Sequence, residues 1–135
     1  MSLRKYIPLL LLLPLVACSE PPYINIDNQQ LKSLLAQGIP VYDIRREDEW
    51  KQTGVVEGSR KLTYVDDNGR VMSDFVSKFT QTVGKNDPVI LICRTGNRTD
   101  ILARALIKDL GYTKIYNVKN GITRWISEGL PLIHN

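Results

Sequence analysis

The chain has 135 residues, of which 43% are hydrophobic and 24% are charged. This length and composition suit one globular domain, and they exclude a wholly disordered chain, a collagen and a coiled coil. The net charge is +4, and loss of Arg4 and Lys5 with a leader peptide would leave 16 basic against 14 acidic residues. So small a surplus argues against a nucleic-acid-binding protein, which usually carries a concentrated basic face. A disulfide scaffold is excluded because the chain has only two cysteines.

The first 17 residues are typical of a secretory signal. Arg4 and Lys5 precede an apolar run over residues 7–17, and this order of charge and hydrophobicity directs export. Eleven residues are too few for a helix that spans a bilayer, which needs roughly 20. We therefore expect residues 1–17 to be removed, residues 18–22 to form a short tether, and residues 23–135 to form the folded domain.

The end of this apolar run resembles the lipobox of bacterial lipoproteins. It reads Leu15-Val16-Ala17-Cys18, with a small residue directly before the cysteine. The resemblance implies cleavage before Cys18, a diacylglyceryl group on its thiol and a fatty acyl chain such as palmitate on the new amine, which together anchor a protein stably. Ser19 follows, and the absence of Asp there points to the outer rather than the inner membrane, with the domain facing the periplasm. A soluble secreted protein with an incidental Cys18 remains the alternative.

From Tyr23 onward, short apolar runs alternate with helical patterns. We predict strands over residues 23–26, 41–44, 59–65, 88–92 and 114–118, and helices over residues 29–36, 47–52, 74–83 and 99–110 and around Trp125. Asp27 and Ser73 are predicted N-caps, Gly38, Gly84 and Gly111 are predicted helix ends, and residues 66–69 form a strong turn signal. Strands that alternate with helices predict an α/β domain with a mainly parallel central sheet and helices on both faces.

The chemistry is concentrated in one stretch, where the apolar strand 88–92 runs directly into Cys93 and then into a helix. Ligand sites of open α/β sheets gather at such carboxyl ends of strands. Gly96 allows the loop to curl so that backbone N–H groups of residues 94–98 point at the sulfur. The positive end of the helix and the charges of Arg94 and Arg98 also favour a thiolate and an anionic substrate.

Simpler interpretations exist for each of these residues. Cys93 could extend the buried strand as a small apolar side chain, although this leaves Arg94, Gly96 and Arg98 unexplained. Arg94 and Arg98 could contact the substrate directly, or each could pair with an acid such as Asp43 or Glu49.

Residues 23–131 resemble a single-domain rhodanese, a sulfurtransferase family, through three motifs in order. The first is Asp43-Ile44-Arg45 with Glu49-Trp50 and residues 54–59, the second is the loop from Cys93 to Thr99, and the third is residues 118–125 with Gly129-Leu130-Pro131. Two positions depart from the family pattern: Val55 replaces the usual His, and Asn120 replaces the first of two glycines.

The resemblance implies a rhodanese fold and a double displacement through a Cys93 persulfide. Cys93 would attack the outer sulfur of a donor such as thiosulfate, and a thiol or cyanide would then accept the sulfur. The persulfide would be held by the backbone N–H groups of the loop, and the arginines would neutralise the donor; the implied binding residues are Arg94, Thr95, Gly96, Asn97 and Arg98. Asp43, Arg45 and Thr99 are implied as supporting residues, with Asp43 and Arg45 bracing the loop from the neighbouring strand end. For Asp43, Arg45 and Glu49, an ordinary structural salt-bridge cluster is preferred over a catalytic role.

Other enzyme classes fit less well. Protein phosphatases and arsenate reductases place five residues between the cysteine and the arginine, whereas four separate Cys93 from Arg98. His134 is poorly placed to serve a cysteine protease, and no resolving cysteine remains for redox chemistry once Cys18 is lipidated. No metal or other cofactor is implied. The main alternative is a non-enzymatic module of the same fold that binds sulfur or a protein partner.

Overall fold

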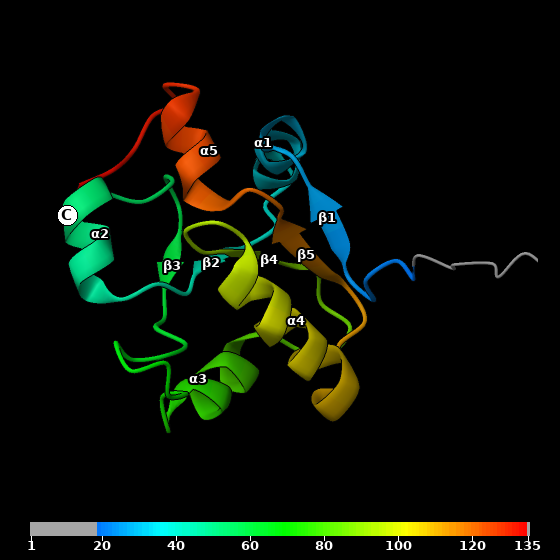
Figure 1. Ribbon diagram of the computed structural model, residues 1–135. Coiled ribbons are helices and arrows are strands. Elements are labelled where there is room, and N and C mark those ends of the chain that lie inside the picture. The colour runs from blue at the N-terminus through cyan, green and yellow to red at the C-terminus, as the bar shows by residue number, and fades with distance from the viewer. Residues whose placement is uncertain (1–18, 135) are drawn as a thin grey trace, which may run out of the picture.

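The structure is a computed structural model that describes residues 19–134, which form five strands and five helices (Figure 1). Strands and helices alternate along the chain, and a connection from one parallel strand to the next that contains a helix is the usual way of building a parallel sheet. The elements in chain order are β1 (Ile24–Ile26), α1 (Asn28–Ala36), β2 (Val41–Asp43), α2 (Glu47–Thr53), β3 (Arg60–Lys61), α3 (Phe75–Thr82), β4 (Val89–Ile92), α4 (Asn97–Leu110), β5 (Ile115–Val118) and α5 (Gly121–Ser127).

The five strands form one parallel sheet in the order β1-β5-β4-β2-β3. Strand β4 is central, and its last residue, Ile92, pairs with Asp43 at the end of β2. The carboxyl ends of these two strands therefore lie side by side at one edge of the sheet. The predicted α/β fold with a parallel sheet is confirmed.

Strand β4 alternates between two hydrophobic cores, because successive side chains of a strand point to opposite faces. Val89 and Leu91 belong to the core shared with α3 and α4, and Ile90 and Ile92 belong to the core shared with α1 and α5. Figure 1 shows these helix pairs on opposite sides of the sheet. Coverage of both faces explains why residues 88–92 read as a continuous apolar run rather than an alternating one.

Two predicted helix starts are wrong. The helix predicted from Thr99 begins at Asn97, because Gly96 adopts a φ of +93° and serves as the N-cap. The predicted cap Ser73 is not used: Asp74 is the N-cap of α3 and makes no side-chain capping bond. Asp27 does cap α1 as predicted, and its side chain accepts a hydrogen bond from the Gln30 backbone.

The strand predicted over residues 59–65 is much shorter than expected. Only Arg60–Lys61 pairs regularly with β2, at the edge of the sheet. Beyond it, the backbone N–H groups of Leu62 and Tyr64 donate to the carbonyls of Asp43 and Ile44 without forming a regular ladder. This segment therefore follows the carboxyl end of β2 as an irregular edge.

The predictions for the leader, residues 1–17, and for lipidation of Cys18 fall outside the described residues. Within residues 19–134, no helix has both the length and the hydropathy needed to cross a membrane.

Candidate active site

Cys93 lies directly after β4, where the strand meets the loop before α4. Its side chain is buried, with 1% of its surface exposed. The backbone N–H of Gly96 donates to Sγ at 3.2 Å, and the Thr99 hydroxyl lies 3.4 Å from Sγ. Within residues 19–134, Gly96 supplies the one backbone N–H bond to the sulfur, whereas the sequence suggested several from residues 94–98. Thr95 and Asn97 are exposed at this loop.

The loop after Cys93 is fixed by close backbone contact with the turn between β5 and α5. A Cβ atom on Gly96 would lie 2.2 Å from the carbonyl oxygen of Lys119. A Cβ atom on Gly121 would likewise lie 2.3 Å from the carbonyl oxygen of Arg94. Both positions have positive φ, +93° and +60°, so they require glycine for backbone conformation as well as for space.

Two hydrogen bonds from α5 hold the start of the same loop. The Ile122 N–H donates to the Cys93 carbonyl at 2.9 Å, and the Thr123 N–H donates to the Arg94 carbonyl at 3.1 Å. The first turn of α5 therefore positions the backbone of the cysteine itself. The third sequence motif therefore has a structural role. The turn forms although Asn120 replaces the first of the two glycines of the family pattern.

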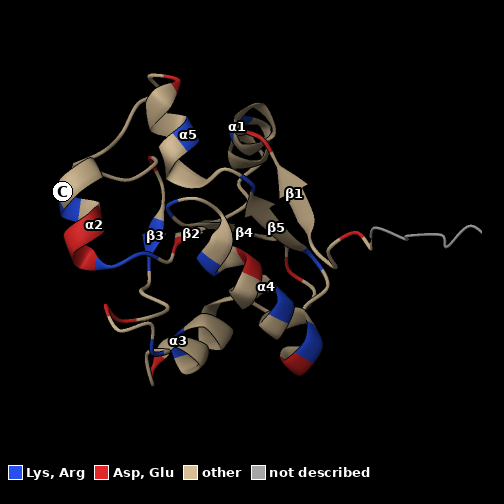
Figure 2. Cartoon of the chain, in the orientation of Figure 1, with Lys and Arg blue, Asp and Glu red and all other residues tan. Residues whose placement is uncertain are grey.

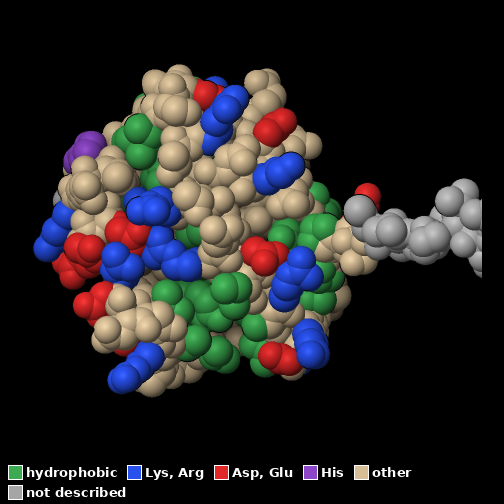
Figure 3. All heavy atoms as spheres, viewed as in Figure 1, with side chains coloured by type: hydrophobic (Ala, Val, Ile, Leu, Met, Phe, Trp, Pro, Cys, Tyr) green, Lys and Arg blue, Asp and Glu red, His purple; other side chains and the backbone are tan. Residues whose placement is uncertain are grey.

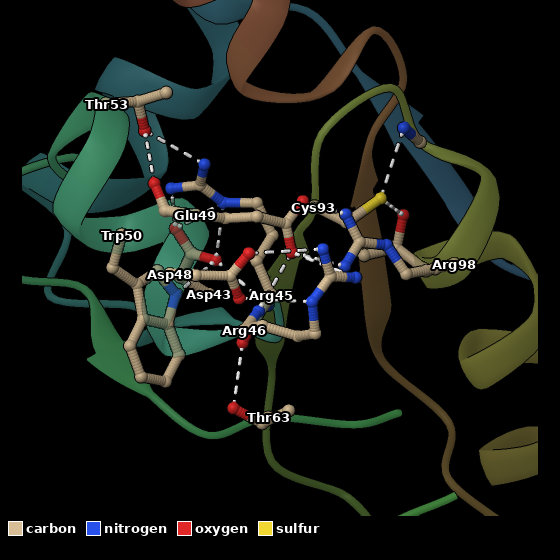
Figure 4. A network of polar contacts seen from close by, with 12 residues as sticks. Asp43, Arg45, Arg46, Asp48, Glu49, Trp50, Thr53, Thr63, Cys93 and Arg98 are labelled. Carbon is tan, nitrogen blue, oxygen red and sulfur yellow. Dashed lines mark hydrogen bonds and ion pairs between the residues drawn. The ribbon is translucent and has the colours of Figure 1, made fainter. Parts of the chain in front are cut away.

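Asp43 and Arg45 form an ion pair that is almost completely buried, with side-chain exposures of 0% and 1%. The Arg45 guanidinium donates to both carboxylate oxygens of Asp43 and also to Thr53 Oγ1 and the Gly54 carbonyl (Figure 4). The Trp50 indole N–H donates to the same carboxylate at 3.0 Å. The pair therefore connects β2 to the middle and the carboxyl end of α2.

Helix α2 is connected to α4 by a second ion pair. The two terminal nitrogens of Arg98 donate to the two carboxylate oxygens of Glu49 at 2.8 and 2.6 Å. Such two-point pairing has the planar geometry that guanidinium and carboxylate groups prefer. Arg98 could contact a substrate or pair with an acid, and the structure shows the pairing with an acid.

The environment of Glu49 strongly favours its charged form. Burial by itself raises the pKa of this carboxyl, but hydrogen bonds from Arg98 and from the Arg46 backbone N–H outweigh that effect and lower the pKa to about 2. Hydrogen bonding to Glu49 also raises the pKa of Arg98. The pair therefore stays doubly ionised across the ordinary pH range.

Arg94 has a different environment. Its side chain is exposed, and among residues 19–134 it takes part in no salt bridge. It lines a hollow of about 270 Å³ between α2 and α5, together with Arg46, Glu49, Thr123 and Ile126. Figure 2 shows basic and acidic residues close together on α2 and on the neighbouring loop.

The sequence singled out most of the residues that meet here, but it predicted no role for three contributors. Trp50 and Thr53 act through hydrogen bonds to the buried ion pair, and Gly121 acts through its lack of a side chain. The motif containing Glu49-Trp50 pointed to this part of α2, but it gave no sign of which atoms Trp50 would contact. Within residues 19–134, the side-chain hydrogen bonds of Asp43 and Arg45 join them to each other, to α2 and to Gly54, and none goes to residues 93–99.

The arrangement suits nucleophilic chemistry at sulfur. The thiol lies at the amino end of the 14-residue helix α4 and accepts a backbone hydrogen bond, and both features stabilise a thiolate. They would also stabilise a negative charge on a second sulfur bonded to the first. Within residues 19–134, no cluster of three or more metal-ligating side chains is present.

Comparison with known proteins gives one matching family model, the rhodanese-like domain, over residues 27–128. Among curated relatives, thiosulfate sulfurtransferase 18 of Arabidopsis thaliana is 26% identical over 114 residues, which cover 81% of this chain and 82% of the relative. Thiosulfate sulfurtransferase 16 of the same plant is 29% identical over 101 residues, which cover 73% of this chain and 82% of the relative.

Solved structures share the fold. The crystal structure of Rv0390 from M. tuberculosis superposes with a TM-score of 0.69 at 25% identity and covers 84% of this chain and 99% of that one. The polysulfide-sulfur transferase of Wolinella succinogenes superposes with a TM-score of 0.65 at 22% identity, covering 83% and 79%. The second likeness concerns the fold alone.

We predict that Gly96→Ala destabilises the protein much more than Gly111→Ala. Both glycines flank α4 with positive φ, but a Cβ atom on Gly111 would meet nothing within 4 Å. Gly111→Ala should therefore cost about 1–2 kcal/mol of backbone strain, and Gly96→Ala about 3 kcal/mol or more because it also overlaps the Lys119 carbonyl. Urea unfolding measures both values, and equal losses would show that the close approach at Gly96 is unimportant.

We also predict that Glu49→Gln reduces the acid dependence of stability. The folded-state pKa of Glu49 is about 2, below the ordinary value of 4.5, so the stabilisation is present above pH 4.5 and is lost as the pH falls toward 2. The variant should lose on the order of 1 to 2 kcal/mol at neutral pH, reduced by solvent screening, and less near pH 2. Urea unfolding at several pH values checks this, and a loss that did not vary with pH would contradict it.

Proposed function

Because this chain belongs to the rhodanese-like family, we propose that it is a sulfurtransferase that acts through a persulfide on Cys93. The donor would be thiosulfate or a related anion with a sulfane sulfur, and the acceptor would be a thiol or cyanide. One observation carries the proposal: the Cys93 sulfur lies at the amino end of α4 and accepts the Gly96 N–H at 3.2 Å. The names of the two plant sulfurtransferases support the same reaction class.

The reaction consists of two displacements at sulfur. In the first, the Cys93 thiolate attacks the outer sulfur of thiosulfate; the new S–S bond forms as the old one breaks, and sulfite leaves with the bonding electron pair. Charge is conserved, because the persulfide keeps one negative charge and sulfite carries two. In the second, the acceptor anion attacks the outer persulfide sulfur and returns Cys93 as a thiolate.

Groups of this chain would assist each step. The Gly96 N–H and the helix N-terminus stabilise negative charge on the attacking sulfur and then on the persulfide. Arg94 is exposed beside the loop, where its charge can attract an incoming anion. The Thr99 hydroxyl, 3.4 Å from Sγ, can donate to the thiolate and so hold it in place.

A binding module without turnover is the alternative function. The same cysteine could hold a persulfide without passing the sulfur on. The hydrogen bond from Gly96 to Cys93 and the glycine contacts that fix the loop favour chemistry at the sulfur over a surface for protein binding, because they prepare a nucleophile.

We further propose that the domain is anchored in the bacterial cell envelope through lipid on Cys18. The support comes from the sequence: Arg4 and Lys5, the eleven apolar residues and Leu15-Val16-Ala17-Cys18. Residues 19–22 would then connect the anchor to β1, with the domain in the periplasm and the outer membrane the expected destination.

The reaction is tested by mixing the protein with thiosulfate and weighing it by intact mass spectrometry. Wild-type protein should gain one sulfur atom on Cys93, and it should convert thiosulfate and cyanide to sulfite and thiocyanate with double-displacement kinetics. Cys93→Ser should abolish both the mass gain and turnover, because serine cannot form a persulfide. Aryl phosphates should be turned over negligibly.

Three outcomes are distinct. Turnover that survived in Cys93→Ser would remove Cys93 as the nucleophile. A wild-type persulfide that no acceptor discharged would favour the binding module. Release of phosphate from aryl phosphates at a rate comparable to sulfur transfer would favour a phosphatase.

The anchor is tested by expression in a bacterial host that processes lipoproteins. Wild-type protein should partition with membranes and incorporate labelled palmitate, whereas Cys18→Ser should remain unprocessed and unlabelled. Cys93→Ser is the matched control, because it removes the other cysteine and should leave labelling unchanged. Wild-type protein that was released as a soluble, unlabelled periplasmic form would contradict the proposal.

A further inference from the structure

Most of the charged side chains around Cys93 form ion pairs, so their charges offset one another. Asp43 faces Arg45 in the buried ion pair, and Glu49 faces Arg98 in the half-buried one. Arg46 lies against Asp48 and Glu49 at the start of α2. Figure 3 shows the same mixture on the surface, where basic and acidic side chains lie together between α2 and α4. Arg94 in the loop and Lys119, whose carbonyl adjoins Gly96, are exposed cations that form no salt bridge among residues 19–134.

Glu49 pairs with Arg98 through both of its carboxylate oxygens. Its carboxylate accepts both terminal nitrogens of Arg98, at 2.8 and 2.6 Å, and it also accepts the Arg46 backbone N–H at 3.0 Å. The last contact belongs to the amino-terminal turn of α2, so the carboxylate is oriented by its own helix as well as by its partner. Its side chain is 12% exposed, so solvent screens the pair only in part.

This cancellation matters because Arg98 is close to the sulfur. Arg98 is the second residue of α4 and directly precedes Thr99, whose hydroxyl contacts Sγ. Figure 4 shows the Arg98 side chain running from below Cys93 toward Glu49. An uncompensated guanidinium here would attract both the thiolate and an anionic donor. Glu49 reduces that attraction and keeps the guanidinium directed at α2.

We propose that Glu49 is a positioning residue that sets donor specificity: by holding Arg98 and cancelling its charge, it makes the site favour singly charged alkyl persulfides over the thiosulfate dianion. The inference rests on the proposed sulfur transfer and deepens it. With the thiolate included, thiosulfate brings three negative charges together, whereas an alkyl persulfide anion brings two. A site in which Glu49 cancels the charge of Arg98 has less positive charge to offset this repulsion, so it penalises the thiosulfate dianion more than the persulfide anion.

The step with the preferred donor is balanced without any other reactant. The Cys93 thiolate attacks the terminal sulfur of the alkyl persulfide anion, the S–S bond of the donor breaks, and the alkyl thiolate leaves with the electron pair. One negative charge remains on the Cys93 persulfide and one departs with the thiolate. No oxidant or reductant is consumed.

The test compares the two donors in single turnover with the purified full-length protein. Thiosulfate and 2-hydroxyethyl persulfide are the probes, and the rate at which Cys93 gains one sulfur is followed by intact mass. Glu49→Gln keeps a hydrogen-bond acceptor for Arg98 but removes the negative charge. We expect it to raise the loading rate with thiosulfate about tenfold relative to the persulfide, and to move the pH midpoint of Cys93 alkylation down by about one unit.

Two matched variants separate charge from structure. Glu47→Gln makes the same charge change on α2, but Glu47 is exposed and pairs with Lys51, so the donor ratio and the alkylation midpoint should stay as in the wild type. Glu49→Asp keeps the charge on a shorter side chain and should keep a donor ratio close to that of the wild type. Thermal melts identify any variant that is unfolded at the assay temperature.

Three results would contradict either the role of Glu49 or the proposed function. If Glu49→Gln and Glu49→Asp changed the donor ratio alike, the role of Glu49 would be structural and the proposal would be wrong. If Glu49→Gln left both the ratio and the alkylation midpoint unchanged, cancellation of Arg98 would be irrelevant to Cys93. Failure of wild-type Cys93 to gain sulfur from either donor would overturn the proposed function instead, while alkylation would still report the charge effect.

Discussion

The buried ion pair between Asp43 and Arg45 is the interaction on which the candidate site depends. Taking two charges out of water is costly, and the cost is offset only when nearly every donor and acceptor of the pair is satisfied. Here the carboxylate accepts from the Trp50 indole as well as from Arg45, and the guanidinium donates to Thr53 and to the Gly54 carbonyl. These partners all come from α2 or its end, so satisfying the pair fixes that helix against the sheet.

Because α2 is held in place, it also helps to hold the loop that contains Cys93. The helix presents Glu49 to Arg98 on one side of the loop, and the turn at Gly121 presses against the Arg94 carbonyl on the other. Cys93 is held between these two contacts, with its own carbonyl bound by α5. Because these contacts set the surroundings of Cys93 in advance, the proposed sulfur transfer would need little reorganisation, which is the main source of electrostatic catalysis.

The sequence predicted the parts of this arrangement that depend on local pattern. The apolar run 88–92 predicts a central strand, and Cys93 after it predicts a nucleophile at the carboxyl edge of the sheet. The start of α4 was misplaced because Gly96 caps the helix through its backbone conformation, which leaves no side-chain signal of the kind that Ser or Asp gives. The sequence could not predict the partner of Arg98 either. Glu49 lies 49 residues away, and which acid pairs with Arg98 depends on tertiary geometry.

The placement of Arg98 also explains why this cysteine loop is poorly suited to a phosphate ester. A tetrahedral oxyanion needs an arginine that can direct its planar pair of N–H donors at two phosphate oxygens. In this protein both terminal nitrogens of Arg98 already donate to Glu49, whose pKa of about 2 keeps it ionised. Breaking that pair to bind phosphate would leave a half-buried carboxylate facing another anion. A single sulfur bonded to Cys93 does not require an unpaired arginine. The Gly96 N–H and the amino end of α4 can stabilise its charge while Arg98 remains paired with Glu49.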